Sequence, residues 1–387
     1  ALNLLPSKRI LSSVAVILLA ANAGCSLNKK DGSAEGDTKA SPLGPVRLAR
    51  VETAYANLRP ALAEWNLNTY GHDCLLLFDE REEWLIGCSM EGDKSGFRPT
   101  GEAWNGHQIL WNPKSLVVSD KYLPYEQIKL GMVGTVGTHT SEETGAQYPV
   151  LIVQEWDTLR KNHPGFQKSP IEEWLGIFVH EAFHAHQMWH PRVRAIVKRW
   201  DDKQRPATGD ELAAFYGRNE AFRAALGREL DLLKAAANDP ALNTATARNV
   251  LAKWLAMYRD RETLFGATLE VEFPGKDSWF MDGFETFLEG SARYVEAKFL
   301  MSPQKGSADA FKDETTFRNF EQSLGKQPSE LPGLGKMGPK YFYALGMYLC
   351  FVLDAADPSW KGRVFDSDRF LIGQVETVVK SHPQRMP

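Results

Sequence analysis

The stretch SPIEEWLGIFVHEAFHAHQMW, Ser169–Trp189, has the pattern of one long amphipathic helix. Ser169, Pro170 and Glu172 are typical of a helix start, because a serine N-cap, a proline at the first helical position and a glutamate at the third form a capping box. Apolar residues at helical spacing predict a buried ridge, made of Ile171, Trp174, Phe178, Ala182, Ala185 and Trp189. His180 and His184 fall on the opposite side, one turn apart.

The character of the chain changes at this helix. Before it, short apolar runs broken by Gly, Asn, Asp and Pro predict strands of a mostly antiparallel sheet. These runs are CLLLF, EWLIGC, HQILW, SLVVS, GMVGTVGT and YPVLIVQEW. From residue 169 helical periodicity dominates. Helices are expected at 46–66, 169–189, 191–201, 209–237, 244–265, 278–300 and 339–355. Strands followed by helices predict an α+β architecture.

Composition fits a globular protein that does not bind nucleic acid. The chain has 387 residues, of which 43% are hydrophobic, enough for one large domain or two modest ones. Its net charge is −4 and it has no long basic block. Nucleic acid is therefore not expected as a partner.

The N-terminal segment is expected to direct export. Lys8 and Arg9 precede the apolar run ILSSVAVILLAANA, which is short for a membrane span and typical of a signal peptide. Gly24-Cys25 resembles the end of a bacterial lipobox, with Cys25 lipidated, whereas Ala21-Asn22-Ala23 would suit an ordinary signal peptidase. We expect a signal peptide and lipobox at 1–25, a flexible tether at 26–45 and one domain at 46–387, sheet-rich over 46–168 and helical over 169–387. The expected location is the bacterial cell envelope, as a periplasm-facing lipoprotein anchored in a membrane.

The cysteines carry a separate expectation. Cys74 and Cys88 flank two apolar runs around the polar turn DERE, so they can face each other across a β-hairpin. In an oxidising compartment this arrangement favours a disulfide, although two buried thiols would fit the same pattern. Cys350 lies in an apolar helix and is expected to be a core thiol.

His180-Glu181-x-x-His184 is an HExxH pattern. Imidazoles at i and i+4 project side by side and can bind one zinc ion, which lowers the pKa of a bound water toward 7. Glu181 lies beside them, where it can take a proton from that water and pass it to a leaving amine. A solvated polar face would not explain this glutamate. His186 and His190 point elsewhere, and we expect them at the surface or behind the ligands.

A third ligand is expected on a second amphipathic helix, DGFETFLEGSARYVEAKF, Asp282–Phe299. Glu285, Glu289 and Glu296 line one stripe of that helix, and the small residues at 290–292 would let it approach the histidines closely. The alternative is an acidic face turned to solvent.

The two motifs HEAFH and LEGSARYVE together resemble the gluzincin branch of the zincin-like metallopeptidases. The resemblance covers about thirty residues plus the order of the elements. It implies a zincin-like fold, a zinc cofactor, His180, His184 and Glu289 as ligands, and Glu181 as the general base; Glu285 is the alternative third ligand. The implied activity is cleavage of peptide or protein substrates. Hydrolysis of a non-peptide cell-envelope amide, and a non-catalytic metal-binding lipoprotein, are the alternatives.

The resemblance also implies an edge strand beside the HExxH helix that binds extended substrate. Residues 148–156 are the candidate for this strand or its neighbour, and Gly134–His139 would suit either a loop near the cleft or ordinary sheet. Tyr343 is the candidate oxyanion donor, ahead of Tyr341 and Tyr348, with core packing as the alternative. For Arg259, Arg261 and Arg293 we expect ion pairs rather than substrate binding.

Overall fold

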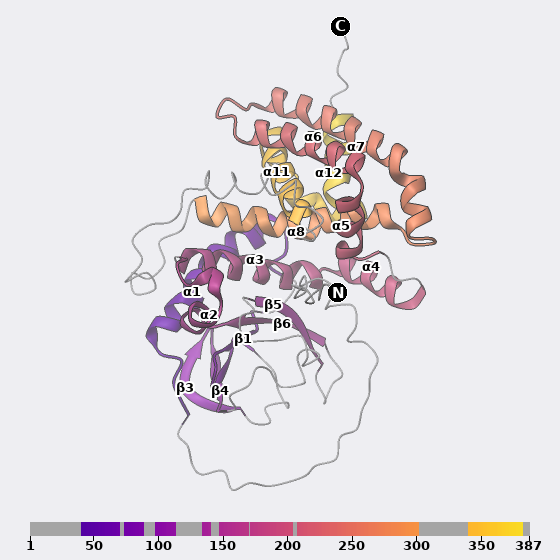
Figure 1. Ribbon diagram of the computed structural model, residues 1–387. Helices are drawn as coiled ribbons and strands as arrows, with labels where there is room; N and C mark the ends of the chain where they lie inside the picture. The colour runs from indigo at the N-terminus through magenta and orange to yellow at the C-terminus, as the bar shows by residue number, and fades with distance from the viewer. Residues whose placement is uncertain are drawn as a thin grey trace.

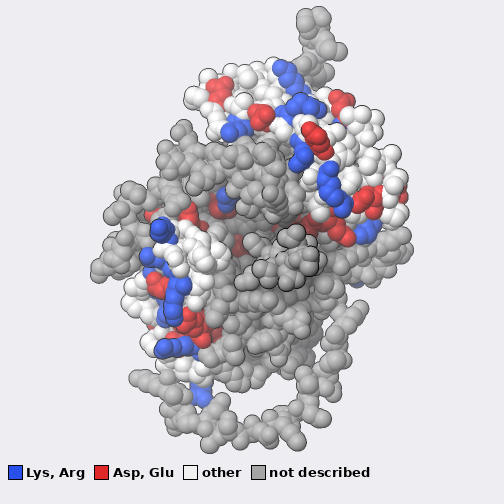
Figure 2. Space-filling view, in the orientation of Figure 1, with Lys and Arg blue, Asp and Glu red and all other residues white. Residues whose placement is uncertain are grey.

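The computed structural model describes residues 40–69, 73–88, 97–113, 134–140, 147–169, 171–203, 207–301 and 340–381. Its architecture is α+β, with the sheet gathered at one end and most of the helices at the other (Figure 1). The described surface in Figure 2 carries acidic and basic side chains side by side. In the described part of the chain, every helix is too short or too polar to cross a membrane.

Six strands form one sheet in the order β3-β4-β2-β1-β6-β5. Their bounds are β1 Leu75–Phe78, β2 Glu83–Ile86, β3 Arg98–Trp104, β4 His107–Asn112, β5 Gly134–Thr140 and β6 Gln147–Gln154. All neighbours pair antiparallel except β1 and β6, which run parallel, so the expected mostly antiparallel sheet is confirmed. The run SLVVS lies outside the described residues. β3 was not predicted.

The sheet is buried on both faces where it passes under the helices. On β1, Leu75 and Leu77 join the main core, whereas Leu76 and Phe78 join a smaller core on the other face. This alternation follows from the two-residue period of a strand. The main core includes residues of α1 (Pro45–Glu64) and α3 (Ile171–Trp189), which cover that face (Figure 1).

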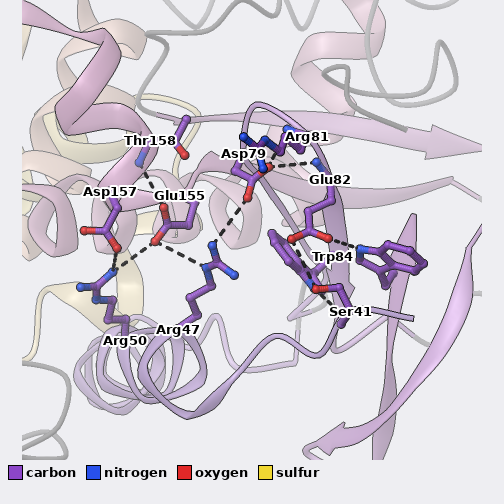
Figure 3. A network of polar contacts seen from close by, with 11 residues as sticks. Ser41, Arg47, Arg50, Asp79, Arg81, Glu82, Trp84, Glu155, Asp157 and Thr158 are labelled. Atoms are coloured by element: carbon purple, nitrogen blue, oxygen red, sulfur yellow. Dashed lines mark hydrogen bonds and ion pairs between the residues drawn. The ribbon is translucent and has the colours of Figure 1, made fainter. Parts of the chain in front are cut away.

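A polar network fixes α1 to the sheet (Figure 3). Arg47 and Arg50 both reach the buried carboxylate of Glu155, at 3.6 and 3.2 Å. Glu155 also begins α2 (Trp156–Asn162), because its other oxygen accepts a hydrogen bond from the backbone of Thr158 at 3.1 Å. The start of α1 is anchored too, since Leu43 is buried and donates its backbone N–H to Glu102. Residues 43–45, which were expected in the flexible tether, are therefore part of the ordered domain.

The cysteine expectations are confirmed. Cys74 and Cys88 form a disulfide that joins the start of β1 to the residues after β2, with Cα atoms 4.5 Å apart. Cys350 is a buried free thiol. The disulfide closes the hairpin whose strand β1 lies next to β6.

The helical part begins at α3, and most expected helices are present. The remaining helices are α4 Pro191–Lys203, α5 Gly209–Arg218, α6 Glu220–Ala237, α7 Thr244–Glu272, α8 Ser278–Met301, α11 Lys340–Ala356 and α12 Phe370–Lys380, with short 3-10 turns η3 Pro164–Phe166 and η6 Lys361–Asp366. The prediction of a single helix at 209–237 is wrong. Asn219 adopts an extended conformation and caps α6 by accepting from the backbone of Phe222 at 2.9 Å, so the chain breaks there into α5 and α6. α2, α12 and both 3-10 turns were not predicted.

The helix α3 lies between two layers, with the sheet and α1 on one side and α8 on the other (Figure 1). The predicted ridge is buried, with only Trp189 partly exposed, but the opposite side of α3 is buried as well, so the alternative of a solvated histidine face is wrong. His180 and His184 are only 4% and 6% exposed. Pro170 lies outside the described residues, so the expected capping box is not described; the Ser169 hydroxyl donates to the carbonyl of Gly165.

The helices α8 and α11 cross in backbone contact. A Cβ atom added to Gly290 would lie 2.3 Å from the Cα of Gly346, and one added to Gly346 would lie 2.1 Å from the carbonyl oxygen of Thr286. Only glycine leaves room for such an approach. The crossing sets Tyr343, one turn before Gly346, against the part of α8 that carries Glu289.

Candidate metal centre

Three donor atoms from two helices converge in the buried layer between α3 and α8. Nε2 of His180 lies 3.1 Å from Nε2 of His184, and each of these nitrogens lies 3.5 Å from Oε2 of Glu289. The three side chains are buried, and they form a group able to hold one metal ion. Because i and i+4 share a helix face, the two histidines are placed by α3 itself, and α8 supplies the carboxylate.

The separations of these donors fit one shared cation. Zinc bonds of about 2.0–2.1 Å in a tetrahedral arrangement place neighbouring donor atoms about 3.4 Å apart. The observed 3.1–3.5 Å lie around this value. Both oxygens of Glu289 are buried without a hydrogen-bond partner of good geometry among the described residues. A buried carboxylate left in this way is costly unless a cation reaches it. Two imidazoles and a carboxylate are a donor set that zinc accepts.

The pKa shifts of the cluster also indicate that positive charge is stabilised there. Burial lowers the pKa of His180, but Glu289 and Glu296 outweigh burial and raise it to about 10. Burial raises the pKa of Glu289, yet His184 and His180 outweigh it and hold this pKa far below its usual range. Without a metal the site therefore favours a proton on His180, and a bound divalent cation would compete with that proton.

Glu296 supports His180 from behind. Its Oε2 lies 3.2 Å from Nδ1 of His180, and its other oxygen pairs with Arg293. Burial raises the pKa of Glu296, but Arg293 and His180 lower it to about 2, so it stays ionised. Gly176, one turn before His180, makes room for this carboxylate, because a Cβ there would lie 3.3 Å from Cγ of Glu296.

His184 has a different support. Its Nδ1 lies 3.0 Å from Oε1 of Gln187, and Nε2 of Gln187 donates to the Ser291 hydroxyl at 2.7 Å. Both supporting side chains are fully buried. Gln187 was missed in the sequence, although its place one turn after His184 on the same helix face was a usable signal.

Glu181 lies beside the donor cluster, as the pattern predicts. It is 8% exposed, and burial raises its pKa. The start of β5 passes next to it, since a Cβ added to Gly134 would lie 3.3 Å from Cγ of Glu181. Of the two alternatives for Gly134–His139, the sheet is confirmed and the loop is wrong, because these residues belong to β5, one of the two edge strands of the described sheet. Residues 148–156 lie in and just after β6, one strand further in.

Tyr343 reaches the cluster from α11. Its ring stacks on that of His180, with centroids 5.6 Å apart and planes inclined by 15°. Burial and the neighbouring Glu289 raise the pKa of the phenol well above its ordinary value, so its hydroxyl keeps a proton to donate. Tyr341 instead donates to Asp282 at 2.9 Å, and Tyr348 is buried in the core.

Glu285 does not join the donor group among the described residues. Its carboxyl group packs on Gly209, the first residue of α5, and receives a hydrogen bond from that backbone N–H. The three glutamates of the α8 stripe thus contact three different groups. Glu285 meets a helix N-terminus, Glu289 meets both imidazoles, and Glu296 meets the far side of one imidazole.

The remaining candidates have other partners. His186 is buried, not at the surface, and its Nε2 lies 3.5 Å from Asp73. His190 stacks on Phe365. The expected ion pairs are present for all three arginines, as Arg259–Glu376, Arg261–Glu229, Arg261–Asp282 and Arg293–Glu296.

No protein-family model, curated protein or solved structure matches this chain. The fold and the site therefore define an α+β protein with a candidate His-His-Glu metal centre, and any further assignment depends on the chemistry of that centre. Cys25, the expected lipidation site, lies outside the described residues.

Proposed function

We propose that the protein is a zinc-dependent metallopeptidase of the zincin-like type, with His180, His184 and Glu289 as the zinc ligands. The observation that carries the proposal is the convergence of three buried donor atoms, 3.1–3.5 Å apart, from residues 105 positions distant in the chain. The position of Glu289 supports it, because this buried carboxylate faces two imidazole nitrogens and no described Lys or Arg.

The roles of the chain's own groups follow from their positions. A bound zinc ion would supply Lewis acidity and make a water nucleophilic near neutral pH. Glu181 would accept the proton of the attacking water and deliver it to the departing amine, and its raised pKa suits both steps. The Tyr343 hydroxyl would donate a hydrogen bond to the developing oxyanion. The edge of β5 that pairs with no described strand lies beside Glu181 and would hold an extended peptide by backbone hydrogen bonds.

We also propose that the protein works outside the cytoplasm, as an exported lipoprotein anchored at Cys25 in the bacterial cell envelope. The disulfide between Cys74 and Cys88 supports this location, because disulfides persist in oxidising compartments. A peptide or protein of the envelope would then be the substrate.

The experiment that tests the proposal is Glu181→Gln, with Glu173→Gln on the same helix as the matched control. Zinc content is measured by elemental analysis, and cleavage by mass spectrometry on a mixed peptide library. We expect all three proteins to bind one equivalent of zinc. Loss of a general base should lower peptide cleavage by Glu181→Gln by about 10²–10⁴-fold, with cleavage by Glu173→Gln unchanged.

Other outcomes identify the rival functions. Zinc binding without cleavage of any peptide by the wild-type chain would contradict the peptidase assignment. Cleavage of an envelope amide that is not a peptide would then indicate a different hydrolase, and inactivity on both would indicate a metal-binding lipoprotein. Full activity of Glu181→Gln would remove Glu181 as the base.

A further inference from the structure

The two candidate ligand histidines differ in what lies behind them. His180 has a carboxylate on its Nδ1 side, Glu296, which is held by Arg293. His184 has the neutral amide of Gln187. A carboxylate can only accept a hydrogen bond, but an amide presents a donor at one end and an acceptor at the other. The amide supports metal binding only in one of its two orientations.

The hydrogen bonds around Ser291 decide that orientation. The Ser291 hydroxyl lies 2.6 Å from the backbone carbonyl of Phe287, which can only accept. The single hydroxyl proton is therefore used there, and the Ser291 oxygen is left as an acceptor. The group of Gln187 that meets this oxygen at 2.7 Å must then be the NH₂ end.

The consequence passes along the chain of hydrogen bonds to His184. With its NH₂ end toward Ser291, Gln187 turns its carbonyl oxygen toward Nδ1 of His184, at 3.0 Å. A carbonyl oxygen requires a donor, so Nδ1 carries the proton. A neutral imidazole protonated at Nδ1 has a free lone pair on Nε2, and Nε2 is the atom that faces His180 and Glu289.

We propose that Gln187 and Ser291 are positioning residues that fix the Nδ1-protonated tautomer of His184 and so hold its Nε2 ready for the metal. The inference deepens the proposed function, since it rests on the zinc site formed by His180, His184 and Glu289. Partners of this kind orient a ligand ring and typically contribute 10–100-fold to metal affinity.

The test is zinc affinity, measured by competition with a chelating dye on the full chain. Gln187→Met keeps the length of the side chain and removes the acceptor, so we expect zinc binding about 10–100-fold weaker. Gln187→Glu restores an acceptor for the Nδ1 proton and should bind within about threefold of wild type. Ser291→Ala frees the amide to turn over and should fall between wild type and Gln187→Met.

Gln374→Met is the matched control. Gln374 lies on α12, away from the donor cluster. It is also buried, and its amide donates to the backbone carbonyl of Arg363 at 2.8 Å. Its loss measures the general cost of removing a buried amide, and zinc affinity should be unchanged. Circular dichroism of the metal-free proteins checks folding, and Ser291→Ala serves as the second variant if Gln187→Met does not fold.

A spectroscopic measurement separates tautomer control from simple packing. In zinc-loaded protein labelled with ¹⁵N-histidine, we expect one Nδ1–H resonance that is shifted in Gln187→Glu, broadened by exchange with water in Gln187→Met, and unchanged in Gln374→Met. Wild-type zinc affinity in Gln187→Met, or an equal loss in Gln187→Glu, would overturn the inference. A wild-type chain that binds no zinc would overturn the metal centre as well, whereas one that binds zinc but cleaves no peptide would remove only the peptidase activity.

Discussion

One helix, α8, carries two buried acidic clusters that are built in opposite ways. At Asp282 the carboxylate is matched within the protein, by Arg261 at 3.3 Å and by hydroxyl groups of Tyr216 and Tyr341 at 2.7 and 2.9 Å. Seven residues later, Glu289 meets two imidazole nitrogens and no described Lys or Arg. The first cluster is complete with protein groups alone, whereas the second is complete only when a cation is added. The contrast identifies Glu289 as a candidate ligand although both carboxylates are equally buried.

The largest effect is expected from a substitution that breaks the cluster at Asp282. Arg261→Met leaves Glu229 and Asp282 buried without their counter-charge, and loss of one partner of a buried pair costs about 3–5 kcal/mol. Denaturant unfolding of the metal-free protein measures this cost. The folded fraction should still bind zinc with wild-type affinity, because Arg261 does not contact the donor group.

The reciprocal change is Glu289→Gln. Because Glu289 is a proposed zinc ligand, its loss should weaken zinc binding by more than about 100-fold. A residue that only hydrogen-bonds to a ligand typically contributes 10–100-fold. The metal-free protein should lose stability near neutral pH, because Glu289 and the protonated His180 stabilise each other in the fold and the change leaves this buried imidazolium with one carboxylate fewer. Adding zinc at 100 times the wild-type dissociation constant should stabilise the wild type by about 2.7 kcal/mol and the variant by at most about 0.4 kcal/mol. Equal responses of the two proteins to zinc would contradict the comparison.

A smaller effect is expected from crowding the support of His180. In Gly176→Ala the added methyl group lies 3.3 Å from Cγ of Glu296 and should push this carboxylate off Nδ1 of His180. We expect zinc affinity to fall several-fold, less than the 10–100-fold loss typical when such a partner is removed altogether. Gly227→Ala in α6 is the control, because nothing lies within 4 Å of its added Cβ. That variant should gain about 0.5–1 kcal/mol of stability with unchanged zinc affinity.

The smallest effect concerns the residue just beyond α3. Burial and then Arg192 lower the pKa of His190 to about 4. Its folded pKa lies below the unfolded value of about 6.5, so the unfolded chain binds more protons between these values and stability falls as pH drops from about 6.5 to 4. His190→Gln should remove about one proton from the uptake on unfolding in this window. Denaturant unfolding at pH 4, 5 and 7 measures how the free energy of unfolding depends on pH. If that dependence is the same in His190→Gln as in wild type, other groups cause the acid sensitivity.

The elements with strong periodicity were predictable, and those set by one capping group were not. Apolar spacing located α3, α8 and α11 to within a few residues. The break at Asn219 was missed, because an asparagine inside a helical pattern ends a helix only if its side chain turns to cap the next one. β3 was missed because it contains Pro99 and Gly101 and alternates between half-buried and exposed positions, a weak strand signal.

The positions of the histidine pair and of the proposed base were set by local geometry alone. A spacing of four residues on any helix places His180 beside His184, with Glu181 adjacent, whatever the rest of the chain does. That part of the candidate site, and the general α+β order of strands before helices, could therefore be inferred from the sequence.

Only the tertiary structure decided which carboxylate completes the group. Glu285, Glu289 and Glu296 share one stripe of α8, and the crossing of α8 over α3 assigns them to a helix N-terminus, to both imidazoles and to the back of His180. The same crossing brings Ser291 to Gln187, and the separate crossing of α8 and α11 at Gly290 and Gly346 brings Tyr343 to His180. The physical reason is that a helix fixes the direction of its own side chains, while the angle and depth at which two helices pack depend on every residue between them.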